Sequence, residues 1–321
     1  MAAVPRPWIA LAAGISADGG AEHASRVPVR RSRTALPARR EGPMTKPSVA
    51  PFALWGPMRI TTWNVNSIKQ RVGHLLGFLE EARPDVVCLQ ELKCQDAAFP
   101  RAEIEAAGYA VETLGQKAYN GVALLVRAPL TSTQLLRGLP GDAEDEQARY
   151  IEALVHGEGI APVRVASIYL PNGNPAPGPK YAYKLAFMKR LRLHARAMMA
   201  SEDALVLAGD YNVIPEPVDA ADPEAWTQDA LFLPETRQAF RALLAEGFTE
   251  ALRACDPSPG LYTFWDYQAG CWPRNQGIRI DHLLLSPQAA DRLVSASVQR
   301  HLRGLEKPSD HVPVTVELSD G

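Results

Sequence analysis

An acidic and an amide side chain, Asp210 and Asn212, stand two residues apart just after the apolar run 205–208. Because alternate residues of a β-strand face the same way, both would project together from the end of a buried strand. A carboxylate that moves a proton, beside an amide that holds an oxygen without adding charge, suits chemistry at a phosphate group. A plain Gly-Asp turn at a strand end is the alternative interpretation.

Polar and ionisable residues also flank three other strand-like runs. They are Asn64 and Asn66 after residues 58–63, Glu91 after residues 84–90, and Asp310 with His311 before residues 314–318. One such strand end is an ordinary turn, whereas four in one chain indicate side chains that converge on one site.

Glu91 is the first candidate for a metal ligand. It follows a strand too apolar to hold a charge inside, so its carboxylate would lie at the lip of the sheet. A carboxylate there suits Mg²⁺, which prefers oxygen ligands and keeps several waters. Asn64 would be a second ligand or would orient the carboxylate, with Asp210 and Asp310 at neighbouring strand ends. Alternatively, Glu91 forms a salt bridge with Lys93 or caps the next turn. We expect a Mg²⁺ site in which Mn²⁺ can substitute.

Asp281 lies within the run 278–285, two residues after Arg279. An acidic side chain on such a strand needs a partner, because burying an unpaired charge is costly. His311 is the candidate, since a carboxylate that fixes an imidazole tautomer and raises its basicity is a recurring catalytic device. An ion pair between Arg279 and neighbours of Asp281 is the structural alternative.

Tyr169 ends the run 163–170 and is followed by Asn172 in a Pro-Asn-Gly turn. The phenol can donate to a phosphate oxygen, and Asn172 can add a neutral contact. Tyrosines also finish strands for packing alone, and Pro-Asn-Gly is a common turn. Further along, Phe264 and Trp265 belong to an aromatic run that either packs in the core or walls a pocket from which a base is excluded.

Composition sets broad limits on the function. The chain has 321 residues and a mass of 35.0 kDa, and it is 46% hydrophobic and 22% charged, as is usual for a soluble enzyme. Residues 1–57 hold eight basic and three acidic side chains, which leaves 26 basic and 33 acidic, a net charge of −7, for residues 58–321. A polyanion must therefore be met by a local patch and metal ions. Four cysteines without Cys-x-x-Cys spacing indicate a reducing compartment.

Residues 1–57 lack sustained periodicity and are rich in Ala, Pro, Arg and Gly, which indicates disorder. A signal peptide fits poorly, because only one arginine precedes the apolar stretch and a polar stretch follows it. An organelle transit peptide is an alternative that we disfavour. We prefer a third interpretation, in which the natural start is Met58, where the first strand begins. We expect a single domain over residues 58–321, in the bacterial cytoplasm.

The periodicity of the folded part predicts strands interspersed with helices. Strands are expected at 58–65, 85–90, 109–114, 121–127, 149–155, 163–170, 204–208, 261–265, 279–285 and 312–318. Helices are expected at 70–82, 100–107, 179–200 and 234–246, with a long loop over 213–233. This order indicates mixed β-sheets covered by helices, an α/β sandwich, and not a regular βαβ barrel.

Seven short motifs together resemble the exonuclease III family of apurinic/apyrimidinic endonucleases, of the bacterial type. In order they are W-N-V-N at 63–66, L-Q-E-L-K at 89–93, Y-N-G-V-A at 119–123, Y-L-P-N-G at 169–173, G-D-Y-N-V at 209–213, I-R-I-D at 278–281 and S-D-H-V-P at 309–313. The resemblance covers about residues 58–318, which is nearly all of the expected fold.

The resemblance implies a four-layered α/β sandwich of two packed mixed β-sheets flanked by helices, with the site at one end of the paired sheets. It implies a Mg²⁺-dependent DNA repair nuclease. Water would attack the phosphorus in line and cleave the phosphodiester 5′ to an abasic site, and the enzyme would also trim 3′ ends of duplex DNA. The expected partner is duplex DNA with abasic sites or 3′-blocked ends, and we expect a monomer that binds no membrane.

By position, the resemblance also implies roles for single residues. The catalytic residues would be Tyr169, Asp210, Asn212, Asp281 and His311. Metal ligands would come from Asn64, Glu91, Asp210, Asn212, Asp310 and His311. Substrate contacts would come from Asn172, Tyr119, Arg149, Phe264 and Trp265, with Lys69, Arg71 and Lys180 as weaker candidates for the DNA backbone. Asp210 would handle a proton, and His311, held by Asp281, would orient the attacking water or bind a non-bridging oxygen.

Two positions depart from some relatives. Asn66 stands where some members have an aspartate, although bacterial members commonly share the amide, and Ile278 replaces a tryptophan of some animal members.

Rival functions are a phosphatase or phosphodiesterase acting on inositol phosphates, lipids or nucleotides, and a catalytically silent DNA-binding protein. Tyr169 and the Phe-Trp run argue against the first rival, and the intact polar set argues against the second.

Overall fold

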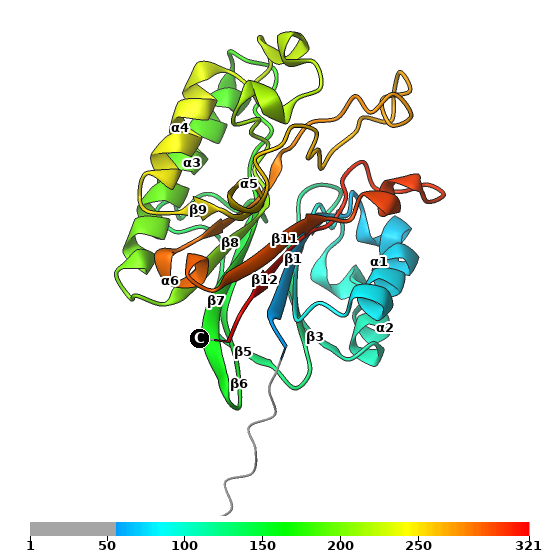
Figure 1. The fold of residues 1–321 in the computed structure, drawn as a ribbon, viewed down its shortest axis with the longest axis vertical. Coiled ribbons are helices and arrows are strands. Elements are labelled where there is room, and N and C mark those ends of the chain that lie inside the picture. Colours follow the sequence, from blue (N-terminus) through cyan, green and yellow to red (C-terminus); the bar gives the residue numbers. More distant parts are fainter. Residues whose placement is uncertain (1–55, 321) are drawn as a thin grey trace, which may run out of the picture. The chain divides into compact units, whose positions relative to one another are not determined.

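The computed structural model describes residues 56–320, in which the strands form two six-stranded β-sheets (Figure 1). Sheet 1 has the order β11 (Leu293–Val298), β12 (Val314–Leu318), β1 (Met58–Asn64), β2 (Val86–Gln90), β4 (Val122–Arg127) and β3 (Tyr109–Leu114). Sheet 2 has the order β5 (Thr131–Arg137), β6 (Tyr150–Gly157), β7 (Ile160–Tyr169), β8 (Ala204–Asp210), β10 (Asp281–Leu285) and β9 (Thr249–Glu250). The predictions for residues 1–57 lie outside the described range, apart from Gly56 and Pro57.

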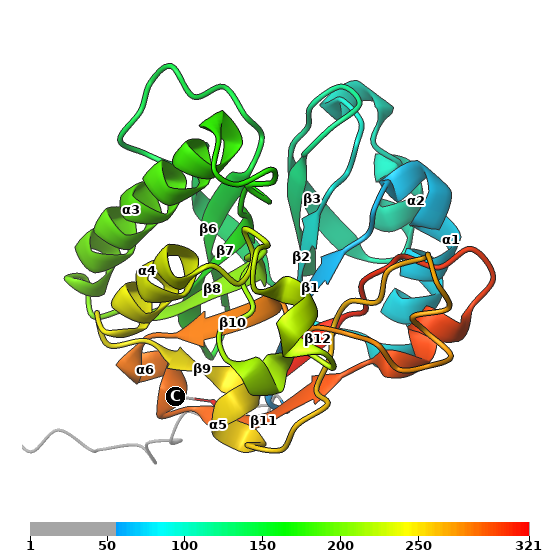
Figure 2. The same ribbon diagram turned by 90° about the horizontal axis from the view of Figure 1, so that it is seen from above.

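Helices cover the outer face of each sheet, as Figure 2 shows. Helices α1 (Ile68–Ala82) and α2 (Arg101–Ala106) lie on sheet 1, and α3 (Pro179–Met199) and α4 (Pro234–Leu244) lie on sheet 2. The short helices are α5 (Ala251–Cys255) and α6 (Pro287–Ala290), with 3₁₀ turns at Asp96–Ala98, Pro217–Asp219, Pro223–Trp226 and Arg300–Gly304. The predicted four-layered α/β sandwich is confirmed.

The apolar core lies in three layers, one between the sheets and one beneath each pair of helices. Helix α1 buries Ile68, Leu75 and Phe78, whose spacing places them on one face of a helix, against outward-facing strand residues such as Trp63 and Leu89. Between the sheets, every second residue of each central strand points inward, because side chains alternate along a strand.

Each sheet contains one parallel pair of strands. In sheet 1, β1 runs parallel to β2, and in sheet 2, β7 runs parallel to β8, while the other pairings are antiparallel. The carboxyl ends of a parallel pair lie at the same edge, so Asn64 and Glu91 come together in one sheet and Tyr169 and Asp210 in the other. β10 begins at Asp281, opposite Asp210. The topology therefore gathers the predicted site residues.

Several elements differ from the sequence prediction. The expected strand 261–265 is wrong, because Phe264 forms only isolated bridges to Ile278 and His311. Strands β5, β9 and β11 and helices α5 and α6 were not predicted. β5 and β11 lie at sheet edges with half-exposed side chains, so their sequences lack the alternation of a strand with one buried face. The expected loop 213–233 contains two 3₁₀ turns.

Two further observations concern the apolar character of the helices and the state of the cysteines. No helix within residues 56–320 is long and apolar enough to cross a membrane. All four cysteines are free thiols, with Cys88 and Cys94 buried.

Gly209 permits the close approach of β8 to β7. A Cβ atom at this position would lie 2.0 Å from the carbonyl oxygen of Ile168, which is backbone and cannot swing away. We expect Gly209→Ala to lower the free energy of unfolding by about 1–3 kcal/mol, because the strands must separate to admit the methyl group. Gly73→Ala in α1, where no atom lies within 4 Å of the added Cβ, should instead raise it by about 1 kcal/mol. Urea denaturation measures the free energy of unfolding of both variants. A Gly209→Ala variant as stable as the wild type would contradict this prediction.

Candidate active site

The Asn64 amide connects the two halves of the site. Its Nδ2 donates to Glu91 Oε1 at 3.1 Å and to Asp210 Oδ2 at 2.9 Å. The Tyr169 hydroxyl donates to the same Glu91 oxygen at 2.7 Å. Asn64 ends β1 and Glu91 follows β2 in sheet 1, whereas Tyr169 and Asp210 end strands of sheet 2, so the Asn64–Asp210 and Tyr169–Glu91 hydrogen bonds connect the two sheets.

Glu91 turns toward the site because its backbone leaves the strand in the left-handed region, with φ of 54°. Strand alternation alone would point this side chain outward, since the preceding Gln90 faces inward. Burial raises the pKa of Glu91, but the charge of Lys93 and hydrogen bonds from Lys93, Tyr169 and Asn64 outweigh it, so the pKa lies below its ordinary value. Glu91 is therefore an anion at neutral pH.

Lys93 occupies the outer side of Glu91. Its Nζ lies 2.8 Å from Glu91 Oε2, so the salt bridge weighed as an alternative for Glu91 is present alongside the contacts to the site. Lys93 also donates to Asn66, whose amide donates to Asp310 Oδ1 at 3.0 Å and to the Tyr267 hydroxyl at 3.2 Å. Asp310 thus joins the site through Asn66.

Asp281 and His311 pair as predicted. His311 Nδ1 donates to Asp281 Oδ2 at 2.9 Å, and the other ring nitrogen, Nε2, lies 3.8 Å from Asp210 Oδ2. Burial lowers the pKa of His311, but the charges of Asp281 and Asp210 raise it more strongly, and the net shift is upward. Burial and the charge of Asp281 raise the pKa of Asp210 above the ordinary carboxyl range, against the opposing charge of His311.

Asn212 holds Asp210 in place. Its backbone N–H donates to Asp210 Oδ1 at 2.9 Å, and its side chain donates to the carbonyl of Leu170 at 2.9 Å and accepts from Asn172 at 3.1 Å. The predicted set Tyr169, Asp210, Asn212, Asp281 and His311 is therefore brought together, with Asn172 at its exposed margin.

Lys184 beneath the site was missed from the sequence. It is fully buried in α3, and its Nζ donates to the backbone carbonyls of Asn172 at 3.0 Å and Asn212 at 2.5 Å. Burial lowers its pKa to about 7. The sequence feature that could have indicated this role is a lysine on the buried face of a helix, three residues from both Tyr181 and Phe187.

The aromatic residues divide between two environments. Phe264 is partly buried, and its ring centroid lies 5.0 Å from that of His311, so it borders the site. Trp265 is fully buried and packs edge-on against Trp272 at 5.0 Å. Phe264 is therefore placed to contact a substrate at the site, whereas Trp265 lies in the core, which is the other environment weighed for this aromatic run.

The candidate DNA contacts differ in exposure. Tyr119 is 71% exposed, and Lys69 and Lys180 are also exposed. Arg149 lies with its guanidinium 4.8 Å from the centre of the Tyr169 ring. Arg71 is buried and bonds the carbonyls of Asn66 and Pro308, so its expected role as a DNA contact is corrected to a structural one.

The donor set fits a hard divalent cation. Asp210, Asp281 and His311 offer ligand atoms within 4.8 Å of one another, and Asn64 and Glu91 add oxygens on the other side of Asp210. Because Asp281 already binds His311 through both oxygens, the Asn64 and Glu91 side is better suited to the ion.

A buried ion network supports the start of β10. Arg279 Nε donates to Asp219 at 2.8 Å, and Nη1 lies 2.8 Å from Glu250 and 3.1 Å from His282 Nδ1. Arg279 therefore pairs with Asp219 and Glu250, while Asp281 pairs with His311. His282 is fully buried in this network and lies 3.1 Å from the carbonyl of Val213.

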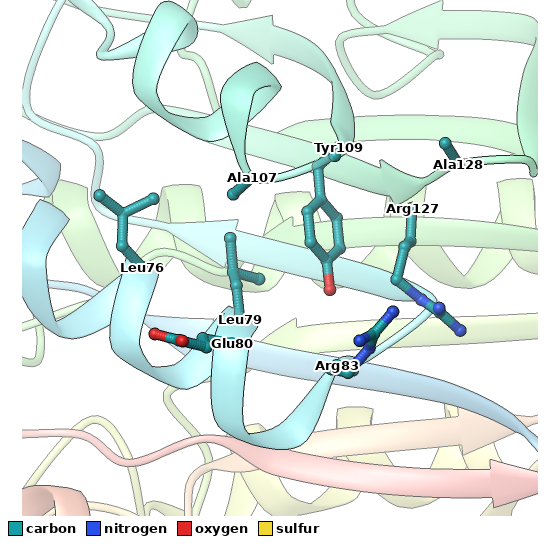
Figure 3. A pocket seen from close by; sticks show the side chains of 9 residues that line it. Leu76, Leu79, Glu80, Arg83, Ala107, Tyr109, Arg127 and Ala128 are labelled. Carbon is teal, nitrogen blue, oxygen red and sulfur yellow. The ribbon is translucent and has the colours of Figure 1, made fainter.

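A separate pocket lies at the opposite end of sheet 1 (Figure 3). It is bordered by Leu79 and Arg83 at the end of α1, Tyr109 at the start of β3 and Arg127 at the end of β4. The active-site residues lie at the other ends of these strands, where Gln90 pairs with Val122.

Comparison with known proteins identifies the family. The sequence pattern of the endonuclease/exonuclease/phosphatase family matches residues 61–311. The chain belongs to this family. Exodeoxyribonuclease III of Haemophilus influenzae is 32% identical over 269 residues, which are 81% of this chain and 100% of that protein.

Solved structures of other relatives share the fold of this family member. A 3′ phosphatase from Neisseria, NExo, bound to a product DNA hairpin, has 38% identity and a TM-score of 0.77, over 82% of this chain and 99% of that one. An AP endonuclease from Archaeoglobus fulgidus has 34% identity and a TM-score of 0.76, over 81% and 99%. The resemblance inferred from the seven motifs is confirmed.

The ion network around Arg279 should make the stability of the fold depend on pH. Burial raises the pKa of Glu250, but the charge of Arg279 and contacts with His282 lower it to about 2. Because this pKa is depressed, its stabilisation is present above the unfolded value of about 4.3 and is lost as pH falls toward 2. We expect Glu250→Gln to unfold more easily at pH 7, by about 3 kcal/mol, and to lose less stability on acidification.

Denaturation at a series of pH values from 7 to 3 measures this effect. Glu317→Gln, which breaks the surface pair with Arg59, is the matched control and should cost under about 1 kcal/mol. A Glu250→Gln variant as stable at pH 7 as that control would refute the predicted contribution.

Proposed function

We propose that this protein is a metal-dependent DNA repair nuclease that hydrolyses the phosphodiester 5′ to abasic sites and trims 3′ ends of duplex DNA. The observation that carries the proposal is the Asn64 amide shared by the carboxylates of Glu91 and Asp210. It places a metal-binding anion and a proton-handling acid within reach of one phosphate group. The related exodeoxyribonuclease III, 3′ phosphatase and AP endonuclease support a DNA substrate.

We propose Mg²⁺ as the cofactor, with Mn²⁺ as a substitute. The four acidic residues of the site outnumber its nearest cations; the acids are Glu91, Asp210, Asp281 and Asp310, and the cations are Lys93 and His311. Such a site repels a phosphate diester unless a cation offsets the charge. Glu91 and Asn64 would hold the ion, with Asp210, Asn212, Asp310 and His311 as further ligands. When bound, it would neutralise charge developing on the phosphate.

The pKa directions support the proton roles that we propose. Because the pKa of His311 is raised, its imidazole carries a proton at neutral pH and can donate from Nε2 to a non-bridging phosphate oxygen, but cannot act as a base. Because the pKa of Asp210 is raised toward neutrality, its carboxyl can both accept and release a proton. Asp210 would take the proton from the attacking water or supply one to the leaving oxygen. Burial keeps the Tyr169 hydroxyl protonated as a donor by raising its pKa.

The surroundings of the site support recognition of duplex DNA. Arg149 stacks on the Tyr169 ring, and Tyr119 is exposed on the loop that follows β3. Phe264 beside His311 offers an apolar wall that would accept a sugar without a base. Asn172 would add a neutral contact at the margin. We further propose a monomer acting in the cytoplasm, which the four free thiols support.

The role of Asp210 is tested by Asp210→Asn. The amide preserves size but cannot exchange a proton, so we expect cleavage of a duplex with one abasic analogue to slow by roughly 10³-fold. Binding of the same duplex, measured by fluorescence anisotropy in EDTA, should change little. Asp142→Asn, at an exposed loop position, is the control. Cleavage by Asp210→Asn at the wild-type rate would overturn the assigned role.

Glu91→Ala tests the metal assignment. Removal of this carboxylate should raise the Mg²⁺ concentration for half-maximal cleavage by at least about tenfold, since the ion loses a charged ligand. Glu112→Ala, which removes an exposed partner of Arg137, is the matched control and should leave the Mg²⁺ dependence unchanged. EDTA should abolish cleavage by the wild type. Hydrolysis of inositol phosphates with no cleavage of DNA would favour the phosphatase rival instead.

A further inference from the structure

A row of neutral polar side chains crosses the interior between the two sheets, one step below the active site. The row consists of Thr62 in β1, Gln90 in β2 and Ser167 in β7, and all three are completely buried. On the inner face of each strand these residues follow apolar ones, such as Ile60, Cys88 and Val165. They therefore separate the apolar core from the charged site.

Hydrogen bonds link this row across the sheets. Gln90 Nε2 in sheet 1 donates to Ser167 Oγ in sheet 2 at 3.0 Å, and Ser167 Oγ donates back to the carbonyl of Leu89 in sheet 1 at 3.0 Å. The Thr62 hydroxyl donates to Gln90 Oε1 at 3.2 Å. Each of the three side chains therefore has partners at hydrogen-bonding distance, as burial requires.

The active site depends on the register of the two sheets. Three of its hydrogen-bonded contacts join residues at the ends of strands in different sheets: Asn64 to Asp210, Tyr169 to Glu91, and His311, which precedes β12, to Asp281. A slide of one sheet by even 1 Å would break contacts of 2.7 to 2.9 Å. The apolar layer beneath cannot prevent such a slide by itself, because apolar attraction is non-directional.

The contacts within the site are also poorly suited to hold this register during the reaction. In the proposed reaction, Glu91 and Asn64 would hold the metal ion and Asp210 would exchange a proton, so each would lose its resting partner. Gln90 and Ser167 carry no charge and touch no reacting group, so their hydrogen bonds can persist throughout. Another link between the sheets, Arg137 to Glu112, lies at the exposed edge.

We propose that Gln90 and Ser167 are positioning residues, which fix the two sheets in the register that brings Tyr169 against Glu91. Gln90 directly precedes Glu91, and Ser167 stands two residues before Tyr169 on the same face of β7. The hydrogen bonds between them thus set the distance between the Tyr169 hydroxyl and the Glu91 carboxylate one step above. This inference rests on the proposed metal-dependent function.

Ser167→Ala tests the inference, with Thr61→Val as the matched control. Thr61 is equally buried, and its hydroxyl bonds that of Thr315 at 2.8 Å, but this contact lies within sheet 1. The Mn²⁺ dissociation constant would be measured directly by electron paramagnetic resonance, together with kcat and KM for the abasic duplex. We expect Ser167→Ala to weaken Mn²⁺ binding roughly tenfold and to lower kcat with KM unchanged. For Thr61→Val, the Mn²⁺ dissociation constant, kcat and KM should all stay within twofold of the wild-type values.

Equal Mn²⁺ affinity in Ser167→Ala and wild type would overturn the proposal. A loss of Mn²⁺ affinity in Thr61→Val as large as that in Ser167→Ala would overturn it too. If Ser167→Ala does not fold, Gln90→Met removes the other partner, and the same result is expected. Since Mn²⁺ binding is measured without DNA, it tests the positioning role even if the wild type fails to cleave the duplex. Failure of the wild type to cleave would count against the proposed function alone.

Discussion

The active site exists only while two separate β-sheets keep one register. Asn64 and Glu91 lie at the ends of strands in one sheet and Tyr169 and Asp210 in the other, so the Asn64–Asp210 and Tyr169–Glu91 hydrogen bonds are contacts across an interface between sheets. Most of that interface is apolar, and apolar attraction is non-directional. Directional contacts are needed to fix one arrangement, and the protein places them in the layer that borders the reacting groups, where an error in position matters most.

Charge burial is the second constraint on this architecture. Asp210, Asp281 and His311 are almost inaccessible to water, and each would be costly alone. The charge of the histidine partly offsets those of the two carboxylates, and both oxygens of Asp210 accept from an amide of Asn64 or Asn212. Water exclusion strengthens every remaining electrostatic interaction. Burial raises the pKa of Asp210, whereas the charges of Asp281 and Asp210 raise the pKa of His311 against the opposing effect of burial.

Much of this arrangement could be predicted from strand alternation. Asn64, Tyr169 and Asp210 lie at the ends of apolar runs in the phase of the inward-facing residues, and their convergence follows from that phase. The position of Glu91 could not be derived in this way, because a left-handed backbone turns it back toward the interior. Lys184 escaped notice because its partners are backbone carbonyls, which no side-chain pattern reveals. The half-exposed edge strands carry little periodic signal, since neither of their faces is fully buried.

The apolar core and the active site consequently belong to the same alternating pattern along the inner faces of the strands. Along the inner face of β1, the residues Met58, Ile60, Thr62 and Asn64 change from apolar to neutral polar to a polar residue of the site, and the inner faces of β2 and β7 change in the same direction. A shift of one residue in any of these strands would turn its inner-face residues toward the helices and remove its polar ones from the site together. Correct packing of the core thus selects the register that assembles the site, and the stability of the fold and the geometry of catalysis depend on the same side-chain alternation. Loops beyond the strand ends, which carry Tyr119 and Phe264, can then differ in sequence without moving the reacting groups.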